Sequence, residues 1–180
     1  MIGIFFATGF EEVEALTTVD LLRRASLEVS VISVTQSLEV TGGHGIKIIA
    51  DMLLEDVDFT ALDAIVLPGG NPGFKNLEKT DALMEKVVAF AGDSSKLVAA
   101  ICGAPSLLGH KKLLEGKKAT IYPGMDAELG NAKVTHASVA RDGNIITSRG
   151  VGTAIDFALE IIKYYQGGAA ASTIAKSIVF

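Results

Sequence analysis

The sequence has one cysteine and no tryptophan among its 180 residues. A single cysteine excludes an internal disulfide framework and any zinc site built from several cysteines. No apolar run reaches the length of a membrane span, so we expect no contact with a membrane. The opening stretch, MIGIFFATGFEE, has no basic region and soon reaches acidic residues, which predicts no secretory signal. The expected location is therefore cytoplasmic.

Positive charge is also scarce. Lysine and arginine number 16 against 21 acidic residues, so the formal net charge is −5, and no basic cluster is present. A chain of this kind lacks the electrostatic footprint of a nucleic-acid-binding protein. Hydrophobic residues make up 49% and charged residues 21%, which excludes wholesale disorder. The length fits a single domain over residues 1–180 with a full core.

Short apolar runs alternate along the chain with longer amphipathic segments. Helices are expected over residues 11–25, 81–91 and 153–165, the last ended by Gly167 and Gly168. The strand-length runs lie at 2–7, 27–34, 64–67 and 97–101. Continuous rather than alternating hydrophobicity is typical of strands that are buried on both faces. The sequence therefore predicts an α/β doubly wound fold, with a mostly parallel sheet and helices on both faces.

Two other segments resemble hairpins. Residues 38–49 hold two short strand-like pieces interrupted by glycines, which predicts a flap added to the main sheet. Residues 133–140 and 144–147 are joined by Arg141-Asp142-Gly143, and Asp-Gly is a strong turn signal.

Cys102 follows a predicted buried strand and precedes a helix that is expected to begin near Ala104 or Pro105. A sharp strand-to-helix turn exposes its central residue at the edge of the sheet, where ligands of such folds bind. The helix N-terminus favours thiolate over thiol, so we expect a depressed pKa for Cys102. The alternative is a buried structural cysteine.

Three acids, Glu11, Glu12 and Glu14, open the first predicted helix. Acids in a first helical turn complement the helix dipole, and this explains Glu11 and Glu12. Glu14 lies near the apolar face, so its carboxyl group could reach a cleft, where burial would raise its pKa. For Glu14 both interpretations remain open.

The loop after the third strand contains Gly69 and Gly70, whose N–H groups could stabilise an oxyanion; the alternative is an ordinary Pro-Gly turn. Acids in the first loop would repel a phosphate, which disfavours a nucleotide or FMN. The histidines, His44, His110 and His136, show no metal-ligand spacing, and none follows Cys102 directly. We expect no metal, no catalytic histidine, and a surface position for His110 at the end of a helix.

Several motifs carry a family resemblance when they are taken in order: GFEEVE at 9–14, DLLRR at 20–24, LPGGN at 67–71, AICGAP at 100–105 and TSRG at 147–150. Together they resemble the ThiJ/PfpI superfamily, in the branch that contains the parkinsonism-associated deglycase. The resemblance implies a flavodoxin-like fold, no cofactor and a homodimer. We expect the dimer contact at the first helix and the flap around residues 42–46.

The resemblance also implies roles for individual residues. Cys102 would be a reactive, oxidation-prone cysteine, and Glu14 a protonated carboxyl group that hydrogen-bonds its thiolate or sulfinate. Tyr122 is a possible third partner. The remaining expected contacts are backbone donors at Gly70 and Gly103 and substrate contacts at Gly69, Asn71 and Arg149.

Two departures from the superfamily narrow the function. Peptidase-like and glutaminase-like members place a histidine directly after the cysteine or in a partner loop. Here Gly103 follows and the C-terminal loop has no His-x-Glu, so both activities are disfavoured. In the deglycase branch a histidine usually precedes the equivalent of Pro123. Tyr122 stands there instead, and tyrosine is a poor proton shuttle at neutral pH.

Two functions remain. The first is a cofactor-free glyoxalase or deglycase that acts on methylglyoxal, glyoxal or their adducts, with a modest activity that protects against carbonyl and oxidative stress. The second is a non-enzymatic redox sensor or redox-regulated chaperone, in which Cys102 is oxidised. Both use Cys102 and Glu14. A role in thiazole biosynthesis is a weaker possibility that no loop supports.

Overall fold

The computed structural model describes all 180 residues. Its main sheet has seven strands in the order β10-β11-β7-β6-β1-β2-β5, and every neighbouring pair is parallel except β10 and β11. The strands of this sheet are β1 (Ile2–Phe6), β2 (Val29–Ser33), β5 (Met52–Leu53), β6 (Ala64–Leu67), β7 (Leu97–Ile101), β10 (Val139–Asp142) and β11 (Ile145–Ser148).

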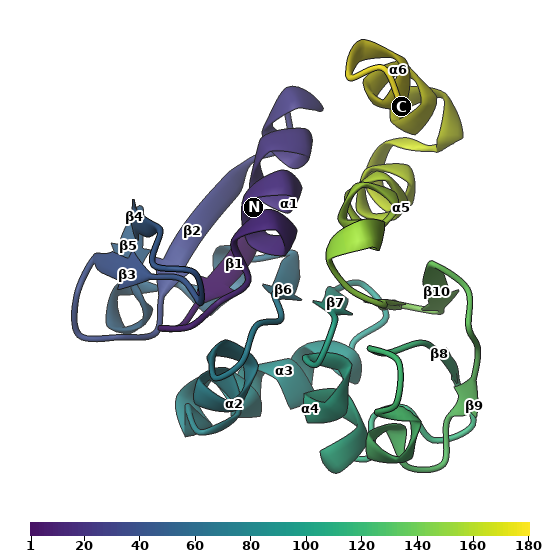
Figure 1. The fold of residues 1–180 in the computed structure, drawn as a ribbon, viewed down its shortest axis with the longest axis horizontal. Coiled ribbons are helices and arrows are strands. Elements are labelled where there is room, and N and C mark those ends of the chain that lie inside the picture. The colour runs from purple at the N-terminus through teal and green to yellow at the C-terminus, as the bar shows by residue number, and fades with distance from the viewer.

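Helices cover both faces of the sheet, with α1, α5 and α6 on one face and α2, α3 and α4 on the other (Figure 1). The predicted doubly wound fold is thus confirmed. The helices are α1 (Glu12–Arg24), α2 (Gly73–Glu78), α3 (Asp81–Ala91), α4 (Pro105–His110), α5 (Ala154–Gln166) and α6 (Gly168–Ser177), with short 3-10 segments η1 (Leu54–Asp56), η2 (Phe59–Ala61), η3 (Asp126–Leu129) and η4 (Val151–Thr153).

The continuous apolar runs are explained by two cores, one on each face of the sheet. They contain 24 and 21 buried residues. Successive side chains of a strand point to opposite faces, so Ile4 and Phe6 of β1 enter the core under α1 and α5, while Phe5 enters the other. Both faces of the strand must therefore be apolar.

The parallel strands bring the loops at their carboxyl ends together at one edge of the sheet. Glu11 N–H donates to the Gly69 carbonyl at 3.0 Å, which ties the β1 loop to the β6 loop. Cys102 N–H donates to the Ser148 carbonyl at 3.0 Å, which ties the β7 loop to the end of β11. The unusual loops of the sequence therefore meet at the place where the fold predicts a site.

The predicted flap is confirmed. Strands β3 (Glu39–Thr41) and β4 (Lys47–Ile49) form a separate antiparallel pair. Backbone hydrogen bonds hold this pair against the loop before α1, from Gly9 N–H to Thr41 O and from Gly43 N–H to Phe10 O, both at 2.8 Å.

Other boundaries differ from the sequence prediction. A turn at the predicted place does join the antiparallel strands β10 and β11, but its two residues are Gly143 and Asn144, because Asp142 still pairs with Ile145. Residues 133 and 134 form a separate strand, β9 (Lys133–Val134), which pairs in parallel with β8 (Lys118–Ala119). Helices α2 and α6 were not predicted. Gly167, with φ +82°, ends α5 but redirects the chain into α6. Ala171 of α6 is buried in the same core as the apolar side chains of α5.

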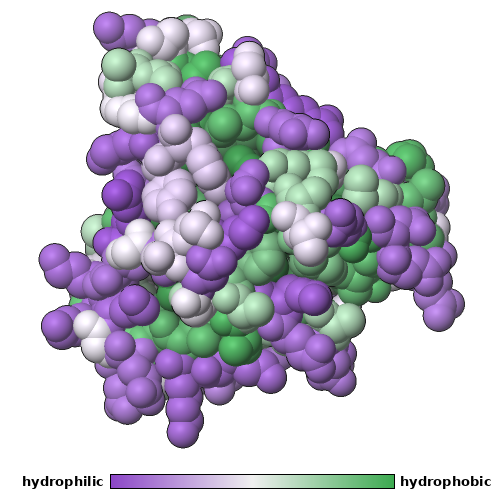
Figure 2. Space-filling view, turned by 180° about the vertical axis from the view of Figure 1, so that it is seen from behind, coloured by the Kyte–Doolittle hydropathy of each residue, from purple (hydrophilic) through white to green (hydrophobic).

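The outer surface is mostly polar. On the side turned away from the viewer of Figure 1, hydrophilic side chains surround smaller hydrophobic patches (Figure 2). None of the helices has the length and apolar character needed to cross a membrane.

Candidate active site

Cys102 lies on a strained turn between β7 and α4. Its φ is +65°, a left-handed conformation that residues other than glycine seldom adopt. Its backbone is fixed on both sides, since its N–H donates to Ser148 O at 3.0 Å and its carbonyl accepts from Tyr122 N–H at 2.9 Å. The sharp turn that the sequence predicts is present, and α4 begins at Pro105 as expected. The side chain is half-buried.

Glu14 points from the first turn of α1 into the interior. The residue is fully buried, and its Oε2 accepts a hydrogen bond from Gly69 N–H at 3.0 Å. No N–H or hydroxyl group reaches Oε1. Glu11 precedes the helix as its N-cap, and its carboxylate accepts from Glu14 N–H at 2.7 Å, so Glu11 caps the helix while Glu14 reaches the cleft. This geometry favours the cleft interpretation of Glu14 over that of an exposed helix-end charge.

Burial raises the pKa of Glu14 to about 7, as the cleft interpretation predicts. Hydrogen bonding to the Cys102 thiol and to Gly69 N–H opposes this shift, while the charge of Glu11 adds to it. Near neutral pH the carboxyl group therefore populates both of its protonation states, which is the property that a general acid or base requires.

The predicted depressed pKa of Cys102 is wrong. Burial raises the pKa of the thiol to about 12, and the negative charge and hydrogen bond of Glu14 add to the effect. The N–H groups of Gly70 and Gly103 act in the opposite direction but are outweighed. Helix α4 has only six residues, so its dipole does not offset a carboxylate beside the sulfur. Near neutral pH the proton of the pair stays on sulfur, and Glu14 is the group that could accept it.

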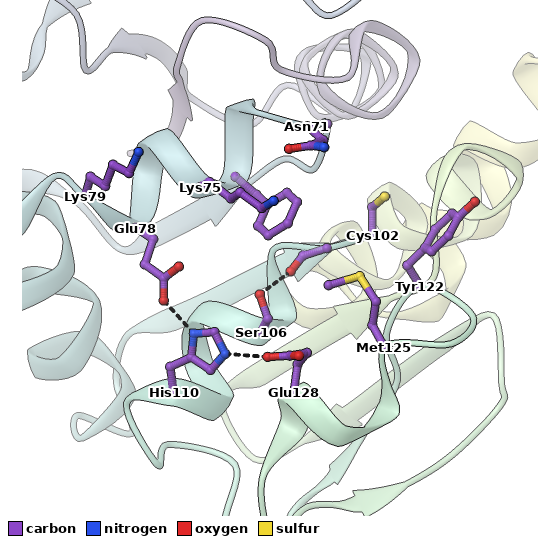
Figure 3. A pocket seen from close by; sticks show the side chains of 13 residues that line it. Asn71, Lys75, Glu78, Lys79, Cys102, Ser106, His110, Tyr122, Met125 and Glu128 are labelled. Atoms are coloured by element: carbon purple, nitrogen blue, oxygen red, sulfur yellow. Dashed lines mark hydrogen bonds and ion pairs between the residues drawn. The ribbon is translucent and has the colours of Figure 1, made fainter.

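Two cavities meet at Cys102. The larger has a volume of about 710 Å³ and extends from Cys102 between α2 and α4 (Figure 3). Of the predicted site residues, it is lined by Gly70, Asn71, Gly103 and Tyr122. The smaller, of about 510 Å³, is lined by Glu14 and Arg149, and it shares Cys102 and Tyr122 with the larger one.

The other predicted contacts are also placed. Gly69 lies between the two central side chains, because a Cβ atom there would clash with Cys102 Cβ and would come within 2.5 Å of Glu14 Oε2. Arg149 donates from Nη1 to His136 O at 3.2 Å, and its buried Nε has no partner. Tyr122 is 50% exposed and borders both cavities.

The sequence does not reveal the part of the larger cavity that lies farthest from Cys102. His110 ends α4 as predicted, but it bridges two carboxylates, from Nδ1 to Glu78 at 2.5 Å and from Nε2 to Glu128 at 2.7 Å. These hydrogen bonds raise the pKa of His110. The three residues come from α2, α4 and η3, and no spacing in the sequence relates them. Only the fold brings them together.

One cluster has the residue types of a metal site. Donor atoms of Glu11, Glu12 and His44 lie within 4.8 Å of one another. Two of the three already bond each other, because Glu12 accepts from His44 N–H at 2.6 Å and contacts its Nδ1 at 2.7 Å. The third, Glu11, caps α1 by accepting from Glu14 N–H, so each residue of the cluster has a structural explanation.

Comparisons with known proteins agree with the fold and the loops. The DJ-1 homolog A of Arabidopsis thaliana is 41% identical over 96% of this chain, and a protein named as a deglycase from Pyrococcus abyssi is 34% identical over 89% of this chain and 96% of its own length. The chain spans less than half of two plant relatives, 45% of DJ-1 homolog A and 37% of DJ-1 homolog B. The structure of oxidized Toxoplasma gondii DJ-1 superposes with a TM-score of 0.95 at 33% identity, over 99% of this chain and 97% of that one.

The family assignment follows from these matches. The model of the DJ-1/PfpI family matches residues 1–164, which include every loop that meets at Cys102. The predicted resemblance is thus confirmed, and the chain belongs to the DJ-1/PfpI family.

Proposed function

We propose that this protein protects against carbonyl stress as a cofactor-free glyoxalase or deglycase, with Cys102 as nucleophile and Glu14 as general base and acid. The observation that carries this proposal is the buried Glu14 carboxyl group, with its pKa raised to about 7, next to a cysteine on a strained turn. A nucleophile with a raised pKa needs an adjacent base, and Glu14 is in contact with the thiol. The relative named as a deglycase supports the same chemistry.

The first step is addition of sulfur to the aldehyde carbon of methylglyoxal. A bond forms between Sγ and that carbon, the thiol proton passes to Glu14, and the carbonyl oxygen becomes an oxyanion. The N–H groups of Gly70 and Gly103, which point at the sulfur, are positioned to stabilise it. Return of the proton to this oxygen gives a hemithioacetal.

The later steps move hydrogen between adjacent carbons. Glu14 removes the proton from the carbon bonded to sulfur and delivers it to the neighbouring carbon, while the hydroxyl proton of the hemithioacetal passes to the former ketone oxygen. The former aldehyde thereby becomes a thioester and the ketone a secondary alcohol. Water then cleaves the thioester, releasing lactate and restoring the thiol. The balance is methylglyoxal plus water to lactic acid, and no external oxidant is needed. Because Tyr122 is a poor proton shuttle, Glu14 carries the proton in this proposal.

The test is lactate formation from methylglyoxal. We expect Cys102→Ser to abolish it and Glu14→Gln to lower kcat/KM at least about hundredfold, the usual contribution of a general acid–base group. Glu28→Gln removes an exposed acid elsewhere and serves as the matched control. Since the base form of Glu14 is required, kcat/KM of the wild type should rise with pH through about 7. Equal lactate formation by wild type and Cys102→Ser would refute the proposal.

A redox-sensing role is the second candidate, favoured by the half-buried single cysteine with two backbone donors. The related Toxoplasma gondii protein has been solved in a form described as oxidized. Two equivalents of peroxide would convert the Cys102 thiol to a sulfinic acid with release of two waters. Mass spectrometry after mild peroxide treatment should show this product in the wild type. A Glu14→Leu variant should show a different yield, because the sulfinate would lose its hydrogen-bond donor. Identical yields in both would limit Glu14 to a role outside oxidation.

We also propose a cytoplasmic homodimer, as the sequence predicts. Large hydrophobic side chains are exposed on and beside the first helix and the flap: Val13 at 48%, Leu16 at 37% and Ile46 at 52%. Contact between two copies there would cover them. Light scattering at micromolar concentration should return twice the chain mass, and Val13→Glu should return the mass of one chain. A wild-type mass near 18.8 kDa would contradict the dimer.

A further inference from the structure

The larger cavity is much bigger than the small carbonyl compounds proposed above. Its volume of about 710 Å³ falls in the range that proteins use for ligands of drug-like size, roughly 300–1,000 Å³. Methylglyoxal at Cys102 would fill only one end. The remaining space extends along α2 and α4 towards Glu78 and Lys79 (Figure 3).

The end of the cavity near Cys102 is apolar. The ring of Phe74 packs on the backbone next to the cysteine, since a Cβ atom on Gly103 would come within 2.7 Å of its Cε1. Met125 and Tyr122 also line this part (Figure 3). An aromatic or other flat apolar group bound to Sγ would meet these side chains.

The opposite end is charged. Glu78 and Glu128 both bond His110, whose pKa is raised by these two bonds, so the protonated imidazole offsets one of the two carboxylates and the lysines of the lining bring the sum of charges to +1. Lys75 and Lys79 also line the cavity, and neither forms an ion pair. Lys75 Nζ lies 5.8 Å from the centre of the Phe74 ring, so one positive charge stands at the border of the apolar part.

We infer that this cavity holds the tail of a larger substrate: a reactive carbonyl compound with an apolar, flat segment beside the reacting carbon and an anionic group at Lys75 and Lys79. The inference deepens the proposed function and rests on it for the reaction at Cys102. It makes the two lysines specificity residues, because they contact only the distal part of the substrate.

Selective labelling tests the cavity without requiring turnover. The probes are N-phenylmaleimide and its 4-carboxy and 4-trimethylammonio derivatives, which differ only in the charge at the far end. Each adds its double bond across the Cys102 S–H bond, with sulfur on one carbon and the proton on the other. Cys102 is the only cysteine, so every adduct reports on this site. Dividing each rate by that of the urea-unfolded chain removes the intrinsic reactivity of the probe.

In the folded wild type we expect the carboxylate probe to react fastest and the cationic probe slowest. Lys75→Gln and Lys79→Gln should each lower the preference for the carboxylate over the neutral probe about two- to fivefold, the range of an exposed ion pair. High salt should lower it in the wild type as well, without any substitution. Lys176→Gln, on α6, removes a lysine that does not line the cavity and should change nothing.

The outcomes are separable. A folded protein that shows no preference for the carboxylate probe, or prefers the cationic one, would overturn this inference even if methylglyoxal is converted to lactate. A clear preference that depends on Lys75 and Lys79, in a protein that makes no lactate, would support the anionic tail site and refute only the proposed glyoxalase activity.

Discussion

Glu12 and Glu14 lie two residues apart in the first turn of α1, and their pKa values move in opposite directions. Both are buried, with exposed fractions of 3% and 0%. Burial raises the pKa of each, but at Glu12 hydrogen bonds and the charge of His44 outweigh burial and lower the pKa. Glu14 has one N–H donor, from Gly69, and a bare Oε1, so burial prevails and its pKa rises to about 7.

The comparison shows that burial alone does not set the charge of a carboxyl group; the number of donors that reach it does. Glu12 faces the flap, where His44 satisfies both of its oxygens. Glu14 faces Cys102, where an oxygen is left free. One helical turn therefore provides a permanent anion for structure and a titrating acid for chemistry.

The largest expected effect is on the free energy of unfolding. Replacing the acid by glutamine should raise it at Glu14 and lower it at Glu12. Between about pH 4.5 and 7 the folded protein keeps a proton on Glu14 that the unfolded chain has released, so stability falls as the pH rises through this window. Glu14→Gln removes this cost and should increase the free energy of unfolding at pH 8 by up to about 3 kcal/mol, with no gain at pH 4.

Glu12→Gln provides the matched contrast. The pKa of Glu12 is lowered in the folded state, so its charge stabilises the fold above pH 4.5 and the benefit is lost as the pH falls through the folded pKa. This variant should therefore be less stable than the wild type at pH 8. Urea unfolding of the wild type and both variants at pH 4 and pH 8 gives the six values needed. Changes of the same sign at pH 8 would remove the distinction between the two acids.

The next effect is on the reactivity of Cys102. Because burial and the Glu14 charge both raise the pKa of the thiol, alkylation by iodoacetamide should have its midpoint well above 8.5, the value of a free cysteine. Glu14→Gln removes the charge but not the burial, so it should lower this midpoint, while Glu12→Gln should leave it in place. A wild-type midpoint at or below 8.5 would contradict the raised pKa and favour the depressed pKa that the sequence predicts for Cys102.

The smallest effect is on the flap. The pKa of His44 is raised by its bond to Glu12, so the contact stabilises the flap below about pH 6.5 and weakens as the pH rises through the folded pKa. Hydrogen exchange of β3 and β4, corrected for intrinsic rates, should be slower at pH 5.5 than at pH 8. The β10–β11 hairpin should show only the change in global stability that Glu14 causes, and His44→Ala should reduce the difference in the flap to that of the hairpin. A flap in His44→Ala that stays more pH-dependent than the hairpin would assign the effect to another group.

Much of the fold could be predicted because strands that are buried on both faces appear in the sequence as continuous apolar runs, as in β1 and β7. Helix α6 could not, because two glycines after α5 predict an end to helical structure. In the fold Gly167 is only a bend, and α6 packs back on α5. The sequence predicts the wrong partner for strand β9, because its parallel pairing with β8 depends on a crossover through residues 120–132 that no sequence pattern marks.

The candidate site could be predicted as far as its individual residues. Cys102, Glu14 and the glycine loops meet because parallel strands end at one edge, a rule that needs no coordinates. The charge state of Cys102 could not be predicted, because it depends on how far the fold buries the sulfur and on which neighbour lies beside it. The helix dipole, which the sequence does reveal, is outweighed by this burial and by the Glu14 carboxylate, which only the fold brings into contact.

Gly69 limits how this site can change. A Cβ atom at this position would enter the space between Cys102 and Glu14, where it would meet Cys102 Cβ and lie within 2.5 Å of Glu14 Oε2. In a comprehensive mutational library, Gly69 should therefore tolerate no replacement that preserves chemistry, although it contributes no side chain. A position can therefore be intolerant of substitution without taking part in the chemistry. A search for functional positions by side-chain chemistry alone would miss Gly69, although its lack of a side chain lets Cys102 and Glu14 approach each other.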